Sequence, residues 1–297
     1  MFPRTRSFEM SHRATRSLKR VICQVGLTLL TAVPVAAQSP PPAQVLLTGP
    51  FVINLGAFLF GTDVKAHLNG QSATNPDVNF RDTFGTARDA TRWRADALWR
   101  MTPTQHLRVL YFDNRSSSAR VLTKNVSWGD YTFQAGSNVS AENRFNILEL
   151  GYEYAFLRRP TVEVAGTVGI HYMRLGLKLA GAATVTNGQG TVSQPAFSTK
   201  VANLPAPLPV LGVRAGWMIA PTWFVEGQGQ FLEVGFGGIK GHVLDLRAGT
   251  NWMFRPGWGL GLGYNHFGAG VTLTKSSFDG GLRMGYGGVQ LNLIRAF

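Results

Sequence analysis

Histidines beside acidic residues are the first candidates for chemistry in this chain, because a hydrolytic site needs an imidazole gathered with a carboxylate or a hydroxyl on one face. His171 shares the face of an extended segment with Glu163 and Thr167. Glu163, however, lies eight residues away, which is roughly 26 Å along a strand. His242 and Asp245 are three residues apart, so a strand would direct them to opposite faces. Neither pair predicts a catalytic dyad.

The other histidines beyond the N-terminal segment give no better site. His106 could approach Glu153 on a neighbouring strand, but at the end of the strands opposite to the long loops, where a surface substrate would not reach it. His67 and His266 lie near loop ends without an obvious acidic partner. We therefore predict no catalytic residue.

Metal and cofactor sites are also missing from the sequence pattern. The single cysteine, Cys23, lies in the N-terminal segment, so the rest of the chain has no thiol for a disulfide, a metal or a nucleophile. Gly259, Gly261 and Gly263 alternate on an extended segment with no helix after it, unlike a phosphate-binding loop. Glycine at every second position is more typical of a crowded interior or a bent strand. We predict no metal and no cofactor.

Charged residues recur at every second position inside otherwise apolar segments. This period predicts β-strands with one polar and one apolar face. Six cations and six anions share the polar face, and because their charges cancel, we expect a salt-bridged interior. They are Arg92, Arg94, Arg100, Arg108, Arg214 and Arg247, with Asp96, Glu149, Glu153, Glu163, Glu226 and Asp245.

Ten alternating segments could carry these faces. Short proline-bearing turns join some of them, whereas connections such as residues 69–85 and 181–203 are longer and rich in Gly, Ser, Asn and Thr. Short turns alternating with long loops are typical of the two sides of a membrane barrel. An even strand number places both barrel ends on the short-turn side. The segments span residues 51–66, 86–101, 106–122, 138–157, 161–179, 206–220, 222–236, 240–254, 258–273 and 280–297.

The apolar faces and the aromatic residues favour a bilayer around these strands. Val289, Leu291, Leu293 and the terminal Phe297 share one face of the last segment. In a bilayer the charged faces can point only into the lumen. Glu142 and Arg144 share a face with the apolar residues of their segment, so they should lie beyond the bilayer. Aromatic residues gather beside the short turns as an interfacial girdle would: Trp99, Tyr152, Tyr154, Phe156, Trp217, Trp223, Trp252, Phe254 and Trp258.

The N-terminal segment has the features of an export signal. A basic start precedes a mostly apolar stretch from Val21 to Val35, and Ala36 and Ala37 supply small residues for cleavage. This segment holds six of the 29 basic and one of the 16 acidic residues, so the mature chain keeps a net charge of +8. Outside the signal there is no run of Lys and Arg, so we expect no nucleic-acid partner.

Together these features predict an all-β fold, a transmembrane antiparallel up-and-down β-barrel of about ten strands preceded by a cleaved signal peptide. We assign residues 1–37 to the signal, 38–50 to a short periplasmic segment and 51–297 to the barrel. The expected location is the outer membrane of a Gram-negative bacterium. The barrel-insertion machinery would be a partner during biogenesis, and we expect a monomer.

Four strand and turn motifs also look familiar. They are YFDNRSSS at residues 111–118, the stretch 145–156 with its GYEY, LPVLGVRAGW at 208–217 and GLGLGYN at 259–265. They resemble a group of uncharacterised proteobacterial outer-membrane β-barrel proteins over most of the mature chain. This resemblance implies the fold and carries no catalytic residue. Arg295 departs from the usual ending, where an apolar residue is commoner.

Three functions remain open from the sequence. We favour a non-enzymatic envelope or surface-interaction protein with a polar, largely closed lumen, because barrels of about eight strands are filled by side chains. The alternative is a narrow channel for small solutes. The third is an outer-membrane hydrolase, either a protease or a lipid A-modifying enzyme.

Outer-membrane lipid and lipopolysaccharide are the expected partners of the loop side. Guanidinium and ammonium groups match phosphate oxygens, and seven basic residues fall near the loops. We predict that some of them bind lipopolysaccharide phosphates; the alternative is that they are solvated loop charges. They are Arg115, Arg120, Lys124, Lys178, Lys200, Lys240 and Lys275.

Two local hypotheses follow from the segment pattern. Residues 115–137 carry Trp128, Tyr131 and Phe133 between alternating residues, which predicts a hairpin beyond the membrane that exposes these aromatics to a partner. Alternatively, the three rings fold onto the barrel mouth. Within the lumen, Glu226 should lie between Arg214 and Arg247, given the turn at Pro221.

Overall fold

The computed structural model describes residues 39–69, 74–187, 190–275 and 278–297. The predicted signal peptide, residues 1–37, lies outside them. Every described strand belongs to one compact unit, residues 41–297. In the described part, no helix is long and apolar enough to cross a membrane.

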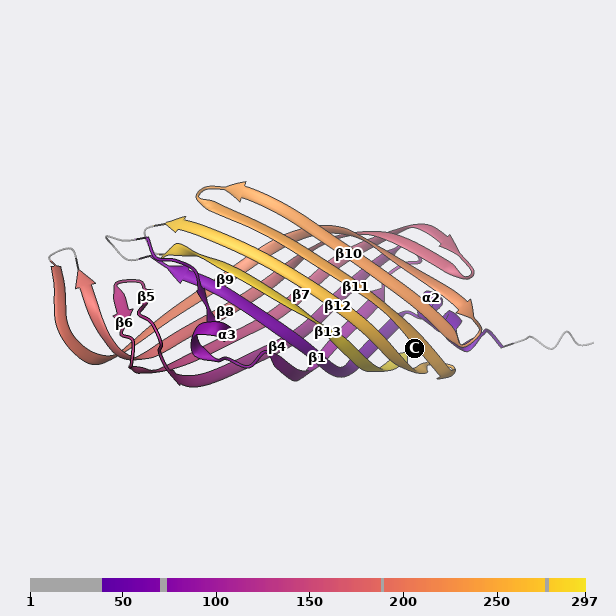
Figure 1. Ribbon diagram of the computed structural model, residues 1–297. Coiled ribbons are helices and arrows are strands. Elements are labelled where there is room, and N and C mark those ends of the chain that lie inside the picture. Colours follow the sequence, from indigo (N-terminus) through magenta and orange to yellow (C-terminus); the bar gives the residue numbers. More distant parts are fainter. Residues whose placement is uncertain (1–38, 70–73, 188–189, 276–277) are drawn as a thin grey trace, which may run out of the picture. The chain divides into compact units, whose positions relative to one another are not determined.

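Ten long antiparallel strands pair in a closed ring, and each ring strand neighbours the ring strands before and after it in the sequence (Figure 1). This confirms the predicted up-and-down barrel of ten strands. In order, the strands are β1 (Phe51–Leu68), β3 (Asp89–Arg100), β4 (Gln105–Val121), β7 (Asn138–Arg159), β8 (Val162–Asn187), β9 (Gly190–Ala220), β10 (Trp223–Phe236), β11 (Ile239–Arg255), β12 (Trp258–Lys275) and β13 (Phe278–Ala296).

Pairing of β1 with β13 closes the ring and brings the two ends of the barrel together. The Phe297 N–H donates to the Phe51 carbonyl at 2.9 Å, so both ends lie at the short-turn end, as predicted. The turn between β11 and β12 needs glycine, because Gly257 has a φ of +76° and a Cβ there would lie 2.7 Å from the Ala296 carbonyl. Two short helices precede β1, η1 (Pro42–Gln44) and α2 (Val45–Thr48), and short elements lie in two connections: β2 (Val78–Asn79) and α3 (Phe80–Phe84) between β1 and β3, and β5 (Val126–Trp128) and β6 (Tyr131–Phe133) between β4 and β7.

The half of the barrel next to the short turns has the polarity of a membrane-spanning wall. Its outward residues are apolar and exposed, and its inward residues include buried charges. The predicted aromatic girdle is part of this outer surface, with Trp99, Trp217, Trp223, Trp252 and Phe156 all exposed. This half therefore presents an apolar belt to lipid.

The loop-side half has the opposite polarity, so the prediction of a polar lumen is corrected for this half of the barrel. Glu142 and Arg144 lie on the outward face there, as predicted, whereas inward neighbours such as Phe145 and Ile147 are fully buried. Outside this half is water, so burial of apolar side chains inside it is favourable. The interior forms one apolar cluster around Phe58, Phe60, Phe112, Phe145, Met173, Phe267, Met284 and Tyr286.

A second apolar cluster closes the short-turn end. The N-terminal segment, in η1 and α2, packs Ala43, Leu46 and Leu47 against residues of the strands such as Leu98 and Phe224. Arg100 donates to the carbonyl of Gly49 at 2.9 Å and also to that of Leu46. The segment predicted to be periplasmic therefore caps this mouth of the barrel, and Figure 1 shows α2 at the same end as the C-terminus.

Residues 181–187 and 190–203, the described part of the connection predicted as a long loop, are instead β structure. β8 and β9 continue their pairing past Gly181, as far as Asn187 opposite Gly190. The small polar residues of this stretch favour strand only weakly by type. The stretch is nevertheless extended, because it continues a β8–β9 ladder that is already formed nearer the short turns.

Alternating prolines shape the upper edge of β9. The Met218 N–H donates to the Thr161 carbonyl just before β8, so even-numbered residues of β9 face β8 and odd-numbered ones face the other edge. Pro205, Pro207 and Pro209 are odd-numbered, so their missing N–H donors belong to that other edge. β10 pairs with β9 only up to Phe231 opposite Leu211. The prolines therefore protect this edge from further pairing.

The hairpin of β5 and β6 does not project into solvent, so the prediction of exposed aromatics at residues 115–137 is wrong. β6 pairs with β8 through Tyr131–Phe133 opposite Ala183–Val185. Trp128 is 1% exposed, Phe133 is fully buried, and the Trp128 ring lies 5.7 Å from that of Phe80 in α3. The alternative holds: these rings fold onto the barrel mouth and extend the apolar cluster.

Replacing Trp128 tests this closure. Trp128→Ala should destabilise the hairpin by about 3–5 kcal/mol, because it removes a large buried ring from packed neighbours. Limited proteolysis of the folded protein should then cut between residues 122 and 137 faster than in wild type. The control Val121→Ala removes a side chain that is 57% exposed and should leave the rate unchanged. Equal cleavage of both variants would contradict the buried hairpin.

Candidate functional site

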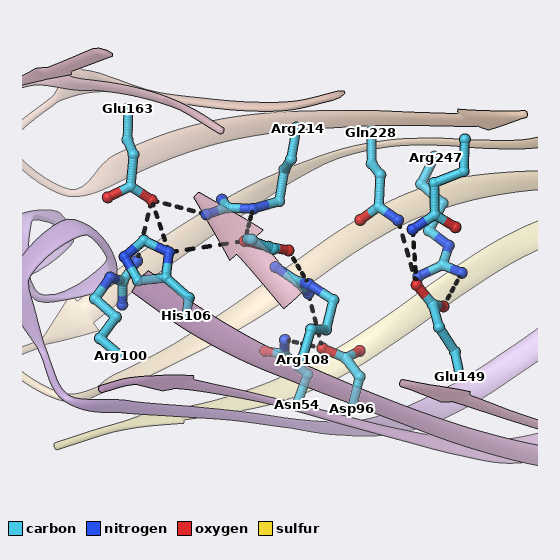
Figure 2. Close-up of polar contacts among 12 residues, drawn as sticks. Asn54, Asp96, Arg100, His106, Arg108, Glu149, Glu163, Arg214, Gln228 and Arg247 are labelled. Atoms are coloured by element: carbon cyan, nitrogen blue, oxygen red, sulfur yellow. Dashed lines mark hydrogen bonds and ion pairs between the residues drawn. The ribbon is translucent and has the colours of Figure 1, made fainter. Parts of the chain in front are cut away.

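Charged and polar side chains from several strands contact one another inside the barrel (Figure 2). This charged layer lies between the two apolar clusters. Its members come from many strands of the ring, because inward positions recur at every second residue. Almost all of its carboxylates are buried and contact arginine. The predicted salt-bridged interior is therefore present, confined to the membrane half.

The part nearer the short turns is centred on Glu153 of β7 and Glu163 of β8. Arg214 joins them, with Nε donating to Glu153 at 2.8 Å and Nη2 to Glu163 at 2.7 Å. Arg108 donates to Glu153 at 2.9 Å and lies 3.6 Å from Asp96. Buried carboxylates are stable here because each shares a guanidinium with a neighbour.

Further groups complete this part. His106 Nδ1 lies 3.8 Å from an oxygen of both Glu153 and Glu163, so the predicted approach of His106 to Glu153 is confirmed. Arg158 lies 3.3 Å from Glu163. Asn54 donates to Asp96 at 2.8 Å.

The part nearer the apolar core is centred on Arg247 of β11. Its Nη2 donates to both Glu149 and Asp245. Gln230 donates to Glu149 at 3.1 Å and also contacts His171 Nε2 at 2.7 Å. Glu149 and Asp245, which come from opposite sides of the ring order, are thus held by one guanidinium.

Arg94 reaches this part without a carboxylate contact in the described residues. It donates to Asn265 at 2.7 Å, and Asn265 donates to Asp245 at 2.6 Å. Its guanidinium also lies 5.3 Å from the ring centre of Phe58. Arg94 therefore joins the charged layer to the aromatic floor of the apolar core, through an amide relay and a cation–π contact.

Besides Arg94, two of the twelve charged residues predicted for the polar face, Arg92 and Glu226, make no ion pair in the described part. Arg92 donates instead to the carbonyls of Thr91 and Arg115, at the wall where β3 no longer pairs with β4. Glu226 does not lie between Arg214 and Arg247 in contact with them: its hydrogen bond comes from Asn251 at 3.0 Å. Within the described part it has no ion pair, because Arg214 extends across β8 toward the acids of β7 and β8.

A small polar cavity lies beside Glu226. Its volume is about 70 Å³, and its lining includes Arg108, Arg214, Arg247, Asn251 and Gln290. Neutral polar partners such as Asn251, Gln228 and Gln230 were missed by counting charges, although their inward parity was readable from the sequence.

Glu149, His171 and Asp245 form the one group of ligating side chains in the described residues close enough to hold a metal ion, with ligand atoms within 4.8 Å of one another. Arg247 already donates to both carboxylates. The cation that these acids need is thus a guanidinium, and we assign the group to the ion-pair network.

On the loop side, His67 has an acidic partner that the sequence did not reveal. Its Nδ1 lies 2.6 Å from Asp77, whose other oxygen accepts from Arg283 at 2.7 Å. His242 is exposed and Asp245 buried, which confirms their opposite faces. His171 lies beside Glu149 and Asp245, 3.9 Å from each, rather than beside Glu163.

The basic residues predicted to contact lipopolysaccharide fall into two groups. Arg115 pairs with Glu142 at 2.9 Å, and Arg120 donates to the Asp82 carbonyl. Lys124, Lys178 and Lys240 are exposed. The side chains of Lys200 and Lys275 lie outside the described part.

The chain resembles several solved protein structures in general architecture. No protein-family model and no curated protein matches the chain. Among solved structures, the outer membrane protease OmpT from Escherichia coli aligns with a TM-score of 0.49 at 10% identity, over 84% of this chain and 97% of that one. The translocator domain of the autotransporter NalP from Neisseria meningitidis aligns with a TM-score of 0.44 at 11% identity, over 96% of this chain and 98% of that one. The toluene transporter TodX of P. putida aligns with a TM-score of 0.37 at 9% identity, over 87% of this chain and 93% of that one.

The charged layer predicts a contrast between two lumen acids. Glu153→Ala removes the carboxylate that Arg108 and Arg214 share, and leaves Arg108 with Asp96 alone and Arg214 with Glu163 alone. Breaking a buried pair costs about 3–5 kcal/mol, less where water reaches the cavity. Glu226→Ala removes one hydrogen bond and should cost about 1 kcal/mol. Thermal unfolding in detergent should therefore show a clearly larger drop for Glu153→Ala. Equal drops would place Glu226 in the ion-pair network after all.

Proposed function

We propose that this protein is a sealed outer-membrane β-barrel of a Gram-negative bacterium, with a non-enzymatic role in the envelope or at its surface. The observation that carries the proposal is the stacking of three barriers along the lumen. The N-terminal segment and its apolar cluster cover the short-turn mouth, the charged layer crosses the middle, and the aromatic core fills the loop-side half.

The lumen chemistry supports a structural role for the charges. Arg108, Arg214 and Arg247 each contact two carboxylates, so their charges are already compensated. Outer-membrane location is supported by the apolar belt, and the alternation before Phe297 suits recognition by the insertion machinery. We infer that the chain acts as a monomer, because its ring closes through its own β1 and β13.

A narrow channel is the second candidate, favoured by the polar cavity of about 70 Å³ in the membrane half. That volume holds only a few waters, and apolar clusters lie on both sides of it. A conducting state would need both clusters to rearrange.

Conductance separates the two functions. Purified wild-type protein in planar bilayers should give no single-channel steps, with an open porin in the same bilayers as the positive control. A variant lacking residues 39–50 should also stay closed, because the aromatic core remains in the loop-side half. Steps from wild type would contradict the sealed barrel, and steps only after the deletion would make the N-terminal segment a plug of a channel.

A further inference from the structure

A polar groove lies on the loop-side wall, across β10, β11, β12, β13 and β1. Its volume is about 570 Å³, and it is lined by His67, Asp77, Glu233, Lys240, His242 and Arg283 with glycines between them. All of these residues except Asp77, which lies in the connection between β1 and β2, occupy outward positions of strands, so the groove is separate from the charged layer of the lumen.

Strand register explains why these residues meet. One row of outward positions runs across the strands through Lys65, Arg283, Gly270, His242 and Glu233. The next row, two residues farther along, runs through His67, Gly281, Thr272, Lys240 and Gly235. Two rows from five neighbouring strands thus carry every charged or imidazole side chain of the groove except Asp77.

Gly270 and Gly281 make the floor of the groove. A Cβ at Gly270 would lie 2.3 Å from Cε1 of His242, and one at Gly281 would lie 2.6 Å from Cε1 of His67. Each imidazole therefore lies over a glycine, and larger residues at these two positions would fill the space between the histidines.

The groove offers both donors and acceptors. Asp77 bridges His67 and Arg283, at 2.6 Å and 2.7 Å, so its charge is compensated and its loop is tied to the wall. Arg283 remains 70% exposed. Lys240 is exposed and has no ion pair within the described part. Two cations and two imidazoles are thus available to an anion, and Glu233 and Asp77 can accept hydrogen bonds from hydroxyl groups.

The groove begins at the edge of the apolar belt. On β10 the outward residue before Glu233 is Phe231, which is 56% exposed, and on β11 the outward residue below His242 is Leu244. One step of two residues is about 7 Å. On β1, by contrast, Lys65 is three such steps beyond the exposed Leu59. The groove therefore extends from the belt edge into the water-facing wall.

We propose that this groove binds the phosphorylated sugar headgroup of an outer-leaflet glycolipid, an inference that rests on the proposed outer-membrane location. Phosphate would bind to Lys240, Arg283 and the imidazoles, since charge-assisted donors suit phosphate oxygens. Sugar hydroxyls would donate to Glu233 and Asp77. A lipid source fits because the groove starts where the acyl-facing belt ends.

Binding to lipopolysaccharide in detergent tests the site. The probes are lipopolysaccharide, the same material after enzymatic dephosphorylation, and inorganic phosphate, each titrated against folded wild-type protein. The charge variant is K240A/R283A. The steric variant G281V narrows the floor without changing charge. The control R174A/K178A removes two exposed cations of β8 outside the groove. Folding of each is checked by the heat-dependent gel migration of the barrel.

Lipopolysaccharide should bind wild type and the control with equal affinity. Its affinity for K240A/R283A should be about a hundredfold lower, because two charge-assisted contacts are lost and each is worth about a tenfold change. G281V should weaken binding as well, and dephosphorylation should weaken binding to wild type. Unchanged affinity in K240A/R283A and G281V, or an equal loss in the control, would overturn the site.

Two other outcomes also decide against the proposal. Inorganic phosphate binding as tightly as the lipid would identify a free anion as the ligand. Release of phosphate or acyl chains from the lipid, lost in H67A, would show an enzyme instead of a binding site. Single-channel conductance is measured separately, so a leaky lumen would refute the sealed barrel while leaving the groove untouched.

Discussion

The solvent outside the barrel wall changes from lipid to water part-way along each strand, and the interior follows this change. In lipid, apolar side chains gain little by moving inside, because acyl chains are as apolar as they are. Charge pairing therefore specifies the membrane half, through contacts such as those of Arg214 with Glu153 and Glu163. Beyond the belt, water makes apolar burial favourable, and the interior becomes the aromatic core around Phe112 and Tyr286.

This division explains why the seal that we propose needs two kinds of barrier, one charged and one apolar. A charged layer alone could admit water along its unfilled spaces, such as the cavity beside Glu226. An apolar core alone could not fill the membrane half, where inward carboxylates must be compensated. The N-terminal segment adds the third barrier by covering the short-turn mouth, and Arg100 binds the charged layer to it through the backbone carbonyl of Gly49.

Strand number, face and pairing could be predicted from the sequence because they depend on a period of two, which local residue types display. Partner choice across the lumen could not. The diagonal position of Glu226 relative to Arg214 follows from register, yet a long arginine side chain reaches the acids of β7 and β8 instead. The aromatics Trp128 and Phe133 were equally ambiguous, since alternation cannot tell whether a hairpin folds inward or projects.

The loop-side dyad of His67 and Asp77 was hidden for another reason. Asp77 belongs to a connection, and its position depends on how that connection returns to the wall rather than on any period. Arg283 fixes it from a strand that is 206 residues away in the sequence. Pairings that join a loop to a distant strand leave no local pattern.

Glycine shows how one residue type has two effects that only the face distinguishes. At Gly259 and Gly261, on the inward face of β12, a Cβ would meet Met253 Sδ at 2.4 Å and Asn251 Oδ1 at 2.6 Å, so glycine there lets a crowded lumen close. Gly270, farther along the same strand, has the opposite parity and lies on the outward face, where the missing side chain leaves space under His242. Glycines on the inward face therefore allow close packing in the lumen, whereas a glycine on the outward face leaves a hollow in the wall. The sequence shows which face each glycine occupies, but only the neighbouring strands decide which side chains lie over it.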